Sequence, residues 1–256
     1  MYLGFLHQLM HSGLREAMKS PRSGRLGRVA FTVTVVSALR LAKERFTYRE
    51  LSTATGIPAP QIARYVSGSS LPSSEKAERI LRGLWKLADP RRALAERLAE
   101  TGGVLDTSVV LTDPLYLTLA SLYYLERLRD IEPTRILVPE ASGIPLATSL
   151  SLLLGAPFTV ARRYMGYGLC SSSEPRFCIR PGQLGRSDRV LIVDDIVETG
   201  MTLRALEEIA DSIGARVEAV AALVVVGDEW RRHTRIARIE AMVYLKKPGM
   251  RREPGL

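Results

Sequence analysis

In the segment VLIVDDIVETGMT (residues 190–202), a short apolar run is followed by acidic and hydroxyl side chains. Residues 190–193 form a short β-branched run, which predicts a strand buried on both faces of a parallel sheet. Asp194 and Asp195 would then follow the carboxyl end of that strand, where open α/β sheets bind ligands. Because carboxylates only accept hydrogen bonds, sugar hydroxyls and hydrated Mg²⁺ are their natural partners.

The residues that follow the two acids have the composition of a phosphate-binding turn. They are Glu198, Thr199, Gly200, Met201 and Thr202. Gly200 permits a tight turn, and Thr202 lies where a helical pattern of apolar residues begins. Backbone N–H groups at a helix N-terminus bind phosphate, and the hydroxyls of Thr199 and Thr202 are further donors. A sugar beside a phosphate implies a ribose 5-phosphate as the ligand.

This stretch resembles the phosphoribosyl diphosphate (PRPP) binding motif of type I phosphoribosyltransferases. That motif has four apolar residues, two acids, two apolar residues, one variable position and then Thr-Gly-x-Thr, and every position is matched here. The resemblance implies that Asp194 and Asp195 contact the ribose 2- and 3-hydroxyls, that residues 198–202 hold the 5-phosphate, and that Mg²⁺ arrives with PRPP without a dedicated protein site. An ordinary βα turn with solvated acids does not account for all these positions.

A second segment, residues 135–163, reads as strand, glycine-containing loop, helix and strand, the βαβ order of a parallel sheet. The resemblance implies that its loop binds pyrophosphate through backbone amides. The loop residues are Glu140, Ala141, Ser142 and Gly143. After the second strand, Arg162 and Arg163 stand where the family places a basic pair near the diphosphate, which suits fixed positive donors. The alternative is that they are two solvated surface arginines.

The positive charge of the chain lies in its first third. The net charge is +9, and residues 1–86 contain 14 Lys and Arg against 5 Asp and Glu, whereas residues 87–256 are neutral. Such a distribution predicts a polyanionic partner for the first part alone. We therefore expect two domains, residues 1–86 and 87–256, with residues 88–92 (ADPRR) as the linker. No run approaches the ~18 apolar residues of a membrane span and no cleavable signal is recognised, so we expect no membrane partner and a cytoplasmic location.

Within the basic part, residues 48–55 and 60–66 are predicted as two short helices joined by a turn that contains Gly56. This pattern resembles the Cro/repressor-like helix-turn-helix, including the exit RYVSGSSLPS, and implies binding to double-stranded operator DNA as a homodimer. The expected DNA-binding residues are Arg49, Ala59, Gln61, Arg64, Tyr65, Ser67 and Ser69. Gln61 would pair with adenine, Arg64 with guanine or phosphate, and the serines with phosphate. The alternative is a helical module for dimerisation or protein contact.

Two features bear on whether the chain is an enzyme. In the family, the segment at residues 164–187 is a flap that closes over the diphosphate, and orotate-type enzymes carry a catalytic lysine there. This chain has no Lys between Lys86 and Lys246, which counts against that type. Glu198 favours catalysis, because hypoxanthine-guanine type enzymes have an Asp at the matching position that handles the purine N7 proton, and a carboxylate can act as a general base. The alternative is that Glu198 is a solvated loop acid, so catalysis stays open.

The cysteine, histidine and amide residues give further expectations about a disulfide, a metal site and the type of organism. Cys170 and Cys178 flank SSSEPRF in the expected flap, and both a reduced pair and a disulfide are compatible with the spacing. His7 and His11 lie one helical turn apart without a third ligand nearby, so we expect no protein metal site. The chain has no Asn, 3 Gln, and 30 Arg against 6 Lys, which suits a thermophile or a GC-rich genome.

The sequence thus predicts an α/β protein: an N-terminal all-α helix-turn-helix domain followed by a type I phosphoribosyltransferase fold with a central parallel sheet. A helix is expected at residues 115–129 and late strands at 216–226 and 239–245. The predicted function is transcriptional regulation in which PRPP or a nucleotide sets the affinity for DNA. The alternatives are a purine-type phosphoribosyltransferase with an N-terminal oligomerisation or nucleic-acid-binding module, and an RNA-binding attenuator.

Overall fold

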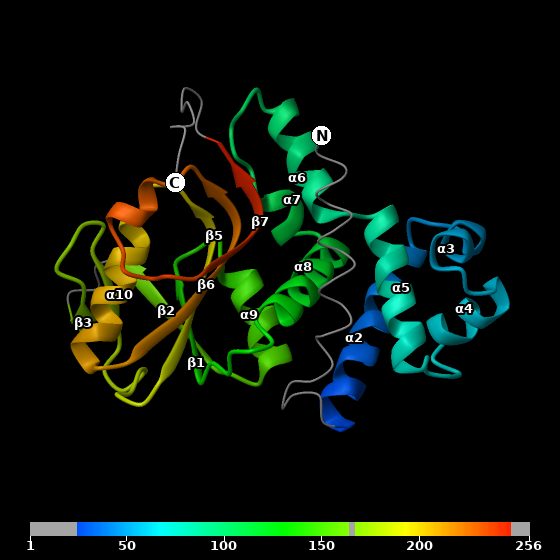
Figure 1. The fold of residues 1–256 in the computed structure, drawn as a ribbon, viewed down its shortest axis with the longest axis horizontal. Helices are drawn as coiled ribbons and strands as arrows, with labels where there is room; N and C mark the ends of the chain where they lie inside the picture. The colour runs from blue at the N-terminus through cyan, green and yellow to red at the C-terminus, as the bar shows by residue number, and fades with distance from the viewer. Residues whose placement is uncertain (1–24, 164–166, 247–256) are drawn as a thin grey trace, which may run out of the picture. The chain divides into compact units, whose positions relative to one another are not determined.

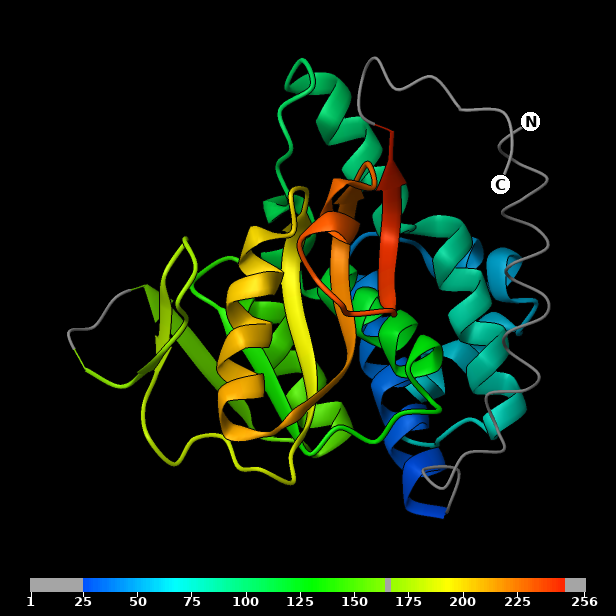
Figure 2. The ribbon, with the colours of Figure 1, turned by 60° about the vertical axis from the view of Figure 1, so that its left-hand side comes forward.

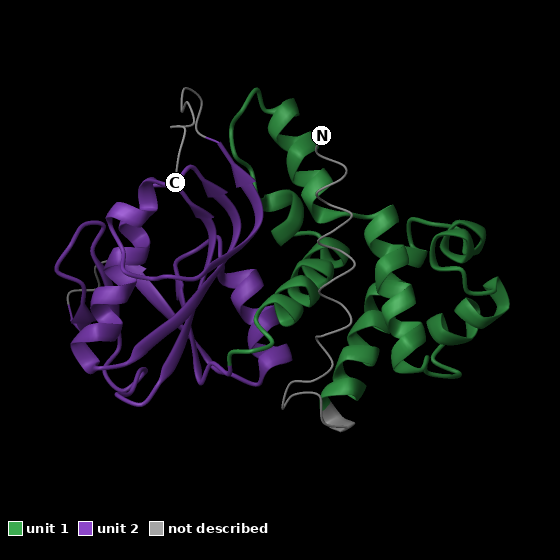
Figure 3. Cartoon of the chain, viewed as in Figure 1, with its two compact units in different colours: residues 1–131 green, residues 132–256 purple. Residues whose placement is uncertain are grey.

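The computed structural model describes residues 25–163 and 167–246 of the chain. It divides into two compact units, residues 1–131 and 132–256 (Figure 3). The first is helical and the second is built on a sheet. None of the helices among the described residues is long and apolar enough to cross a membrane.

The helical unit is built from a series of helices. They are α2 (Arg25–Lys43), α3 (Tyr48–Thr55), α4 (Ala59–Val66), α5 (Ser74–Leu87), α6 (Pro90–Glu100), α7 (Ser108–Leu111) and α8 (Pro114–Arg127). Helices α2 to α5 and α8 share an apolar core. Leu39, Leu51, Ile62, Leu84 and Leu119 are fully buried in this core. The core therefore joins α2 to α5 with α8, the helix predicted at residues 115–129.

The first helix of the expected helix-turn-helix is defined by its two ends. Thr47 and Glu50 form a capping box at the start of α3, in which the Glu50 N–H donates to the Thr47 hydroxyl and the Thr47 N–H donates to the Glu50 carboxylate. Gly56 ends the helix in the left-handed conformation, with φ of 66°. Arg79 of α5 donates to the Gly56 carbonyl oxygen, so α5 fastens the turn between α3 and α4.

The prediction of a linker at residues 88–92 is wrong. Helix α6 begins at Pro90, and Asp89 caps it by accepting a hydrogen bond from the Arg91 N–H. An acidic N-cap followed by proline at the first helical position is a helix start, because proline lacks only an N–H that would have no partner there. The Arg91 guanidinium also lies over the Trp85 ring, 5.0 Å from its centroid, which ties α6 to α5.

The second unit contains a seven-stranded sheet in the order β3-β4-β2-β1-β5-β6-β7 (Figure 1). Its strands are β1 (Arg135–Pro139), β2 (Phe158–Arg163), β3 (Leu169–Cys170), β4 (Phe177–Ile179), β5 (Arg189–Val197), β6 (Arg216–Val226) and β7 (Ile239–Leu245). Strands β2, β1, β5, β6 and β7 are parallel, as predicted. Strands β3 and β4 are antiparallel, so the sheet is mixed at one edge.

Two helices cover opposite sides of this sheet (Figure 2). Helix α9 (Ile144–Leu154) connects β1 to β2, and α10 (Met201–Ile213) connects β5 to β6. The α10 residues Leu203, Leu206 and Ile209 are buried with Ile192 of β5 in one apolar core of the unit. From β1 the chain crosses to β2 on one side in the sheet order, whereas from the neighbouring β5 it crosses to β6 on the other side. The crevice between these two strands is therefore a topological switch point, where open α/β sheets bind ligands.

Candidate functional site

The acids of the expected PRPP motif lie inside β5, whereas the sequence placed them beyond the strand end. β5 pairs with β6 as far as Val197, but its pairing with β1 ends at Ile192. The strand continues because β6 is long enough to support it on one side. Asp194 and Asp195 therefore lie where β1 and β5 separate, at the switch point of the sheet.

The expected pyrophosphate loop comes close to the same part of β5. Gly143 is the N-cap of α9 and has no side chain to occupy the space before the helix. A β-carbon at Gly143 would lie 3.2 Å from the Val193 carbonyl oxygen and 3.3 Å from the Asp194 Cα. Such contacts are tighter than most side chains make, so the close approach of loop and strand depends on glycine. The fold thus brings the two motifs, fifty residues apart in the sequence, into contact.

Glu140 uses its carboxylate to hold the loop in place. Its Oε1 accepts a hydrogen bond of 2.7 Å from the Arg163 N–H, and its own N–H donates to the Ala161 carbonyl oxygen at 2.9 Å. Ala141 and Ser142 at the tip of the loop are exposed, and the Glu140–Ala141 peptide bond is cis. The side chain of Glu140 thus has a structural role, which leaves the backbone amides of the loop and of the first turn of α9 as the groups that could bind an anion.

Gly200 shapes the expected 5-phosphate loop. Its φ of 81° lies in the left-handed region, and α10 begins at the next residue. Gly200 has no side chain that could cap the helix, but its carbonyl oxygen accepts a hydrogen bond of 2.9 Å from the Arg204 N–H. The Thr199 hydroxyl accepts a hydrogen bond of 3.4 Å from the Met201 N–H, while Glu198 and Thr199 are exposed. Thr202 is half-buried in the first turn. The loop therefore presents a helix N-terminus and hydroxyl groups, the combination that binds a phosphate.

Asp194 is the most unusual titratable group of the site. Burial and the neighbouring charge of Asp195 raise the pKa of the Asp194 carboxyl well above its ordinary value. The Asp195 N–H donates to Asp194 Oδ1 at 2.9 Å and partly offsets this. A buried carboxylate with so little compensation is costly unless a ligand supplies hydroxyl donors or a cation. This arrangement is typical of a functional site.

The two expected basic residues end β2 and are both exposed. Arg162 pairs with Cys178 of β4, and Arg163 pairs with Phe177. The Arg163 guanidinium lies over the Phe177 ring, 5.9 Å from its centroid. The role of both arginines at a diphosphate therefore stays a prediction.

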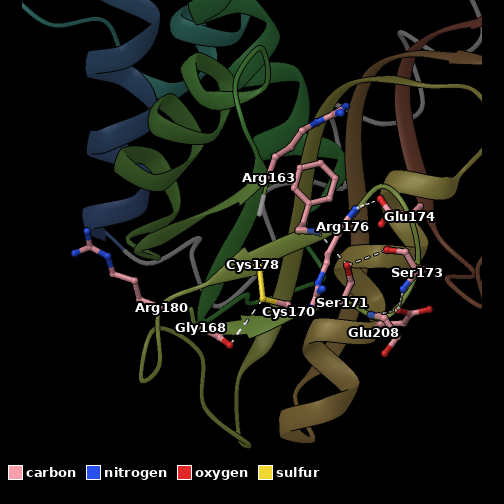
Figure 4. Close-up of a disulfide and its surroundings, with 12 residues drawn as sticks. Arg163, Gly168, Cys170, Ser171, Ser173, Glu174, Arg176, Cys178, Arg180 and Glu208 are labelled. Carbon is pink, nitrogen blue, oxygen red and sulfur yellow. Dashed lines mark hydrogen bonds between the residues drawn. A yellow bond between two sulfur atoms is a disulfide. The ribbon is translucent and has the colours of Figure 1, made fainter. Parts of the chain in front are cut away.

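Strands β3 and β4 lie in the segment expected to be a flap, and a disulfide joins them (Figure 4). Cys170 and Cys178 are directly opposite in the antiparallel pair, with Cα atoms 4.0 Å apart. The question that the sequence left open is answered in the structure by a disulfide. Among the described residues, no group of three or more His, Cys, Asp or Glu side chains could hold a metal ion.

The helix-turn-helix places its expected DNA-binding residues unequally. Arg49, Arg64, Ser67 and Ser69 are exposed, and Ala59 and Gln61 are half-buried. The expectation for Tyr65 is corrected, because its side chain is only 3% exposed and belongs to the helical core. Ile62 and Tyr65 are three residues apart, so they share the inward face of α4. The outward face carries Pro60 and Arg64.

Two residues that sequence reasoning did not single out contact segments of the candidate site. Trp230, in the 3-10 turn η3 (Glu229–Arg232), packs against Gly200: a β-carbon there would lie 2.7 Å from the Trp230 Cα. Glu208 of α10 accepts hydrogen bonds from the segment between β3 and β4. In the sequence, Glu208 is a polar residue on an amphipathic helix, and no motif distinguishes it from the other polar residues there. Trp230 is a large aromatic residue four positions after a predicted strand, which is a signal that the sequence contains.

Comparison with known proteins gives two family matches. Residues 117–244 match the phosphoribosyl transferase domain, and residues 36–84 match a helix-turn-helix family. The chain belongs to the phosphoribosyl transferase domain family. The matched region begins in α8 and ends in β7, and it includes both site loops and the acids of β5.

Relatives of this phosphoribosyl transferase domain occur in archaea. The chain is 32% identical over 128 residues to the orotate phosphoribosyltransferase of Thermococcus gammatolerans, covering 49% of this chain and 64% of the relative. It is 35% identical over 111 residues to the hypoxanthine/guanine phosphoribosyltransferase of Methanosarcina mazei, covering 41% and 59%. It is 42% identical over 109 residues to HGPRTase-like protein 2 of Haloterrigena turkmenica, covering 39% and 59%. The chain thus spans less than two thirds of the length of each relative.

Solved structures support the same fold for the domain. The adenine phosphoribosyltransferase of Thermoanaerobacter pseudethanolicus matches with a TM-score of 0.51 at 22% identity, covering 56% of this chain and 88% of that chain. The adenine phosphoribosyltransferase of Rhodothermus marinus matches with a TM-score of 0.50 at 24% identity, covering 56% and 86%. At these identities the likeness concerns the fold alone.

Proposed function

We propose that this protein is a DNA-binding transcriptional regulator of nucleotide-related metabolism, and that its phosphoribosyltransferase-like domain binds PRPP or a nucleotide as the effector. One observation carries the proposal. The chain joins a ligand site at a sheet switch point to a helix-turn-helix whose outward face has exposed arginines. Among the described residues, Arg49 and Arg64 form no ion pair with an acidic residue, so both guanidinium groups are available to a phosphate backbone or a base edge.

The ligand part of the proposal rests on three groups. The α10 N-terminus with Thr199 and Thr202 would hold the 5-phosphate, and Asp194 and Asp195 would accept hydrogen bonds from the ribose. The loop at residues 140–143, with Arg162 and Arg163, would hold the pyrophosphate. The two carboxylates also suit Mg²⁺ that is bound to the ligand, since hydrated Mg²⁺ prefers carboxylate and phosphate oxygens.

The DNA part of the proposal rests on the outward face of α4. Arg64 and Gln61 would read base edges, and Ser67, Ser69 and Arg49 would contact phosphates. A homodimer would place two α4 helices on one face of the duplex. In this proposal, residues 1–86 bind DNA and residues 87–256 bind the ligand. The compact helical unit itself extends to residue 131.

The competing proposal is a purine-type phosphoribosyltransferase with an N-terminal oligomerisation or nucleic-acid-binding module. Glu198 favours it, because this acid is exposed in the phosphate loop, where a general base for the purine would stand. The hypoxanthine/guanine relatives favour it as well.

Two measurements on the whole protein separate the proposals. The first is selection of DNA sequences by the purified protein, followed by binding to the selected site with and without PRPP and Mg²⁺. The second is pyrophosphate release with adenine, guanine, hypoxanthine, xanthine, uracil and orotate. A regulator shows sequence-selective binding that PRPP changes, with little or no turnover. Brisk turnover on any base, together with DNA binding that ignores PRPP, would establish the enzyme instead.

A further inference from the structure

The segment from β3 through β4, residues 169–179, forms a hairpin that we call the clasp hairpin. It is closed at its base by the Cys170–Cys178 disulfide. Inside the turn, the Ser171 N–H donates to the Phe177 carbonyl oxygen at 2.9 Å, and the Phe177 N–H donates to the Ser171 hydroxyl at 3.0 Å. These bonds fix the geometry of the hairpin, so the position of one of its sides determines the position of the other.

One side of the clasp hairpin is fastened to α10. Glu208 Oε2 accepts hydrogen bonds of 2.9 Å from the Ser172 N–H and of 2.9 Å from the Ser173 N–H (Figure 4). Its Oε1 accepts a bond of 3.1 Å from Arg204 Nε. Although burial raises the pKa of Glu208, the hydrogen bonds from Ser173 and Ser172 lower it below its ordinary value. The carboxylate therefore stays ionised at neutral pH, and bonds to an ionised acceptor are stronger than bonds between neutral groups.

The other side of the clasp hairpin reaches the pyrophosphate loop. Phe177 of β4 is opposite Arg163 of β2, and its ring lies under the Arg163 guanidinium. The Arg163 N–H in turn donates to Glu140 of the loop. A continuous set of contacts thus runs from Glu208 on the phosphate-binding helix, through the hairpin and Phe177, to Arg163 and the loop at residues 140–143.

We propose that Glu208 is a positioning residue, which holds the clasp hairpin so that Phe177 directs the Arg163 guanidinium to a pyrophosphate group at residues 140–143. The inference rests on the proposed function, since it assumes that this loop binds the pyrophosphate. Arginine binds phosphate through a rigid planar fork, so a small change in its direction costs more than the same change in a lysine. The proposed 5-phosphate and ribose contacts lie on α10 and β5, outside the hairpin. Loss of Glu208 should therefore affect the two ends of the ligand differently.

Calorimetry with two separate probes tests this difference. Inorganic pyrophosphate and ribose 5-phosphate are each titrated, with Mg²⁺ present, into the full-length oxidised protein and its variants. Glu208→Ala should weaken pyrophosphate binding by about 5- to 20-fold, the range expected when a charge-assisted contact is partly lost. Ribose 5-phosphate binding should change by less than about twofold. Glu208→Gln should recover most of the pyrophosphate affinity, because its amide oxygen still accepts hydrogen bonds.

Glu207→Ala is the matched control. Glu207 precedes Glu208 on α10, but its carboxylate accepts hydrogen bonds from the Thr234 hydroxyl and the Arg235 N–H instead of the hairpin. This variant should leave the affinity for pyrophosphate unchanged. An equal loss in Glu207→Ala and Glu208→Ala would show a general effect of α10 and overturn the proposal.

The remaining outcomes separate this proposal from the proposed function. If the unmodified protein binds neither probe, the proposed ligand site itself is refuted. If it binds both, and Glu208→Ala weakens both equally or weakens neither, only the role of Glu208 is refuted. Should Glu208→Ala fail to fold, Phe177→Leu provides the second measurement, since it removes the ring beneath Arg163 but keeps an apolar side chain. It should weaken pyrophosphate and spare ribose 5-phosphate, and a non-selective effect or none at all would overturn the proposal.

Discussion

Gly200 and Trp230 are in backbone contact: a β-carbon on Gly200 would lie 2.7 Å from the Trp230 Cα and 2.9 Å from its carbonyl oxygen. Trp230 is only 4% exposed and belongs to the same core as Leu203 and Leu206 of α10. The turn η3, which follows β6, therefore packs against the expected phosphate loop. Glycine at position 200 is required both by its left-handed φ and by this contact.

Gly200→Ala should therefore disrupt the 5-phosphate site. The left-handed φ costs an alanine roughly 1–2 kcal/mol, and the clash with Trp230 adds to that cost because the atoms in the way are its Cα, carbonyl oxygen and Cβ, not the far end of a flexible side chain. We expect a total loss of about 2–4 kcal/mol in the free energy of unfolding and a loss of ribose 5-phosphate binding. Urea denaturation and calorimetry measure the two effects.

Gly182→Ala is the control for this prediction. Gly182 has φ of 79°, close to the 81° of Gly200, but nothing lies within 4 Å of its would-be β-carbon. It should lose only the roughly 1–2 kcal/mol attributed to φ and should keep ligand binding. Equal losses of stability in the two variants would show that the contact with Trp230 is unimportant.

Asp194→Asn should make the protein more stable at neutral pH while it weakens PRPP binding. Because burial and Asp195 raise the pKa of Asp194 in the folded state, the folded protein binds more protons than the unfolded chain above the ordinary aspartate pKa. The free energy of unfolding therefore falls as the pH rises from the unfolded pKa towards the folded one. The amide removes this cost, and its oxygen can still accept from the Asp195 N–H.

Thermal melts of wild type and Asp194→Asn between pH 4 and pH 8 check this sign. The difference in melting temperature should grow in favour of the variant as the pH rises. Asp195→Asn is the control, since Asp195 is half-buried and should show a smaller stability gain with a comparable loss of PRPP affinity. A variant that is less stable than wild type at pH 7, with unchanged PRPP affinity, would contradict the assignment of Asp194 to the ribose.

Arg64→Ala should reduce the affinity for DNA by about 1–3 kcal/mol and relax selectivity at one base pair if Arg64 contacts a base. If Arg64 contacts phosphate, the variant should weaken binding to all sequences alike and reduce the slope of affinity against salt by about one unit. Arg40→Ala is a control of equal charge, because Arg40 is exposed on α2 and lies outside α3 and α4. Equal effects of both variants would mean that α4 has no special role in DNA binding.

Much of this fold follows from local sequence patterns. The helices at residues 48–55 and 74–87 and the strands at 216–226 and 239–245 are strongly periodic or strongly apolar, and the glycine turns bound them. The two expected ligand loops are indicated by their residue types and by the resemblance to the PRPP motif. The structure brings the Gly143 loop close to Asp194, and ligand binding by either loop stays a prediction. Asp89 and Pro90 are typical of a helix start, but the turn-forming composition of residues 88–92 is equally typical of a linker.

The features that the sequence did not predict depend on distant partners. β5 extends through Asp194 and Asp195 because β6 continues beside it. The length of β6 cannot be predicted from residues 190–197. The inward direction of Tyr65 depends on the helices that pack against α4. The contacts of Glu208 with Ser172 and Ser173 join residues more than thirty positions apart, so no local pattern could indicate them.

The last prediction is that effector and operator are thermodynamically coupled. If PRPP changes the geometry of a dimer that holds two α4 helices on the duplex, it must change the affinity for the operator, typically by about 1–3 kcal/mol or roughly 5- to 150-fold. Linkage requires the operator to change the affinity for PRPP by the same factor, whichever direction the effect takes. Calorimetric titrations of PRPP into free protein and into the protein–operator complex, compared with operator titrations at zero and saturating PRPP, measure both factors. The double variant Asp194→Asn, Asp195→Asn is the control, because it should bind operator as wild type does without PRPP and should lose the response to PRPP. Two unequal factors would show that the ligand acts outside this equilibrium, and two factors of one would show that the helix-turn-helix and the ligand site work independently.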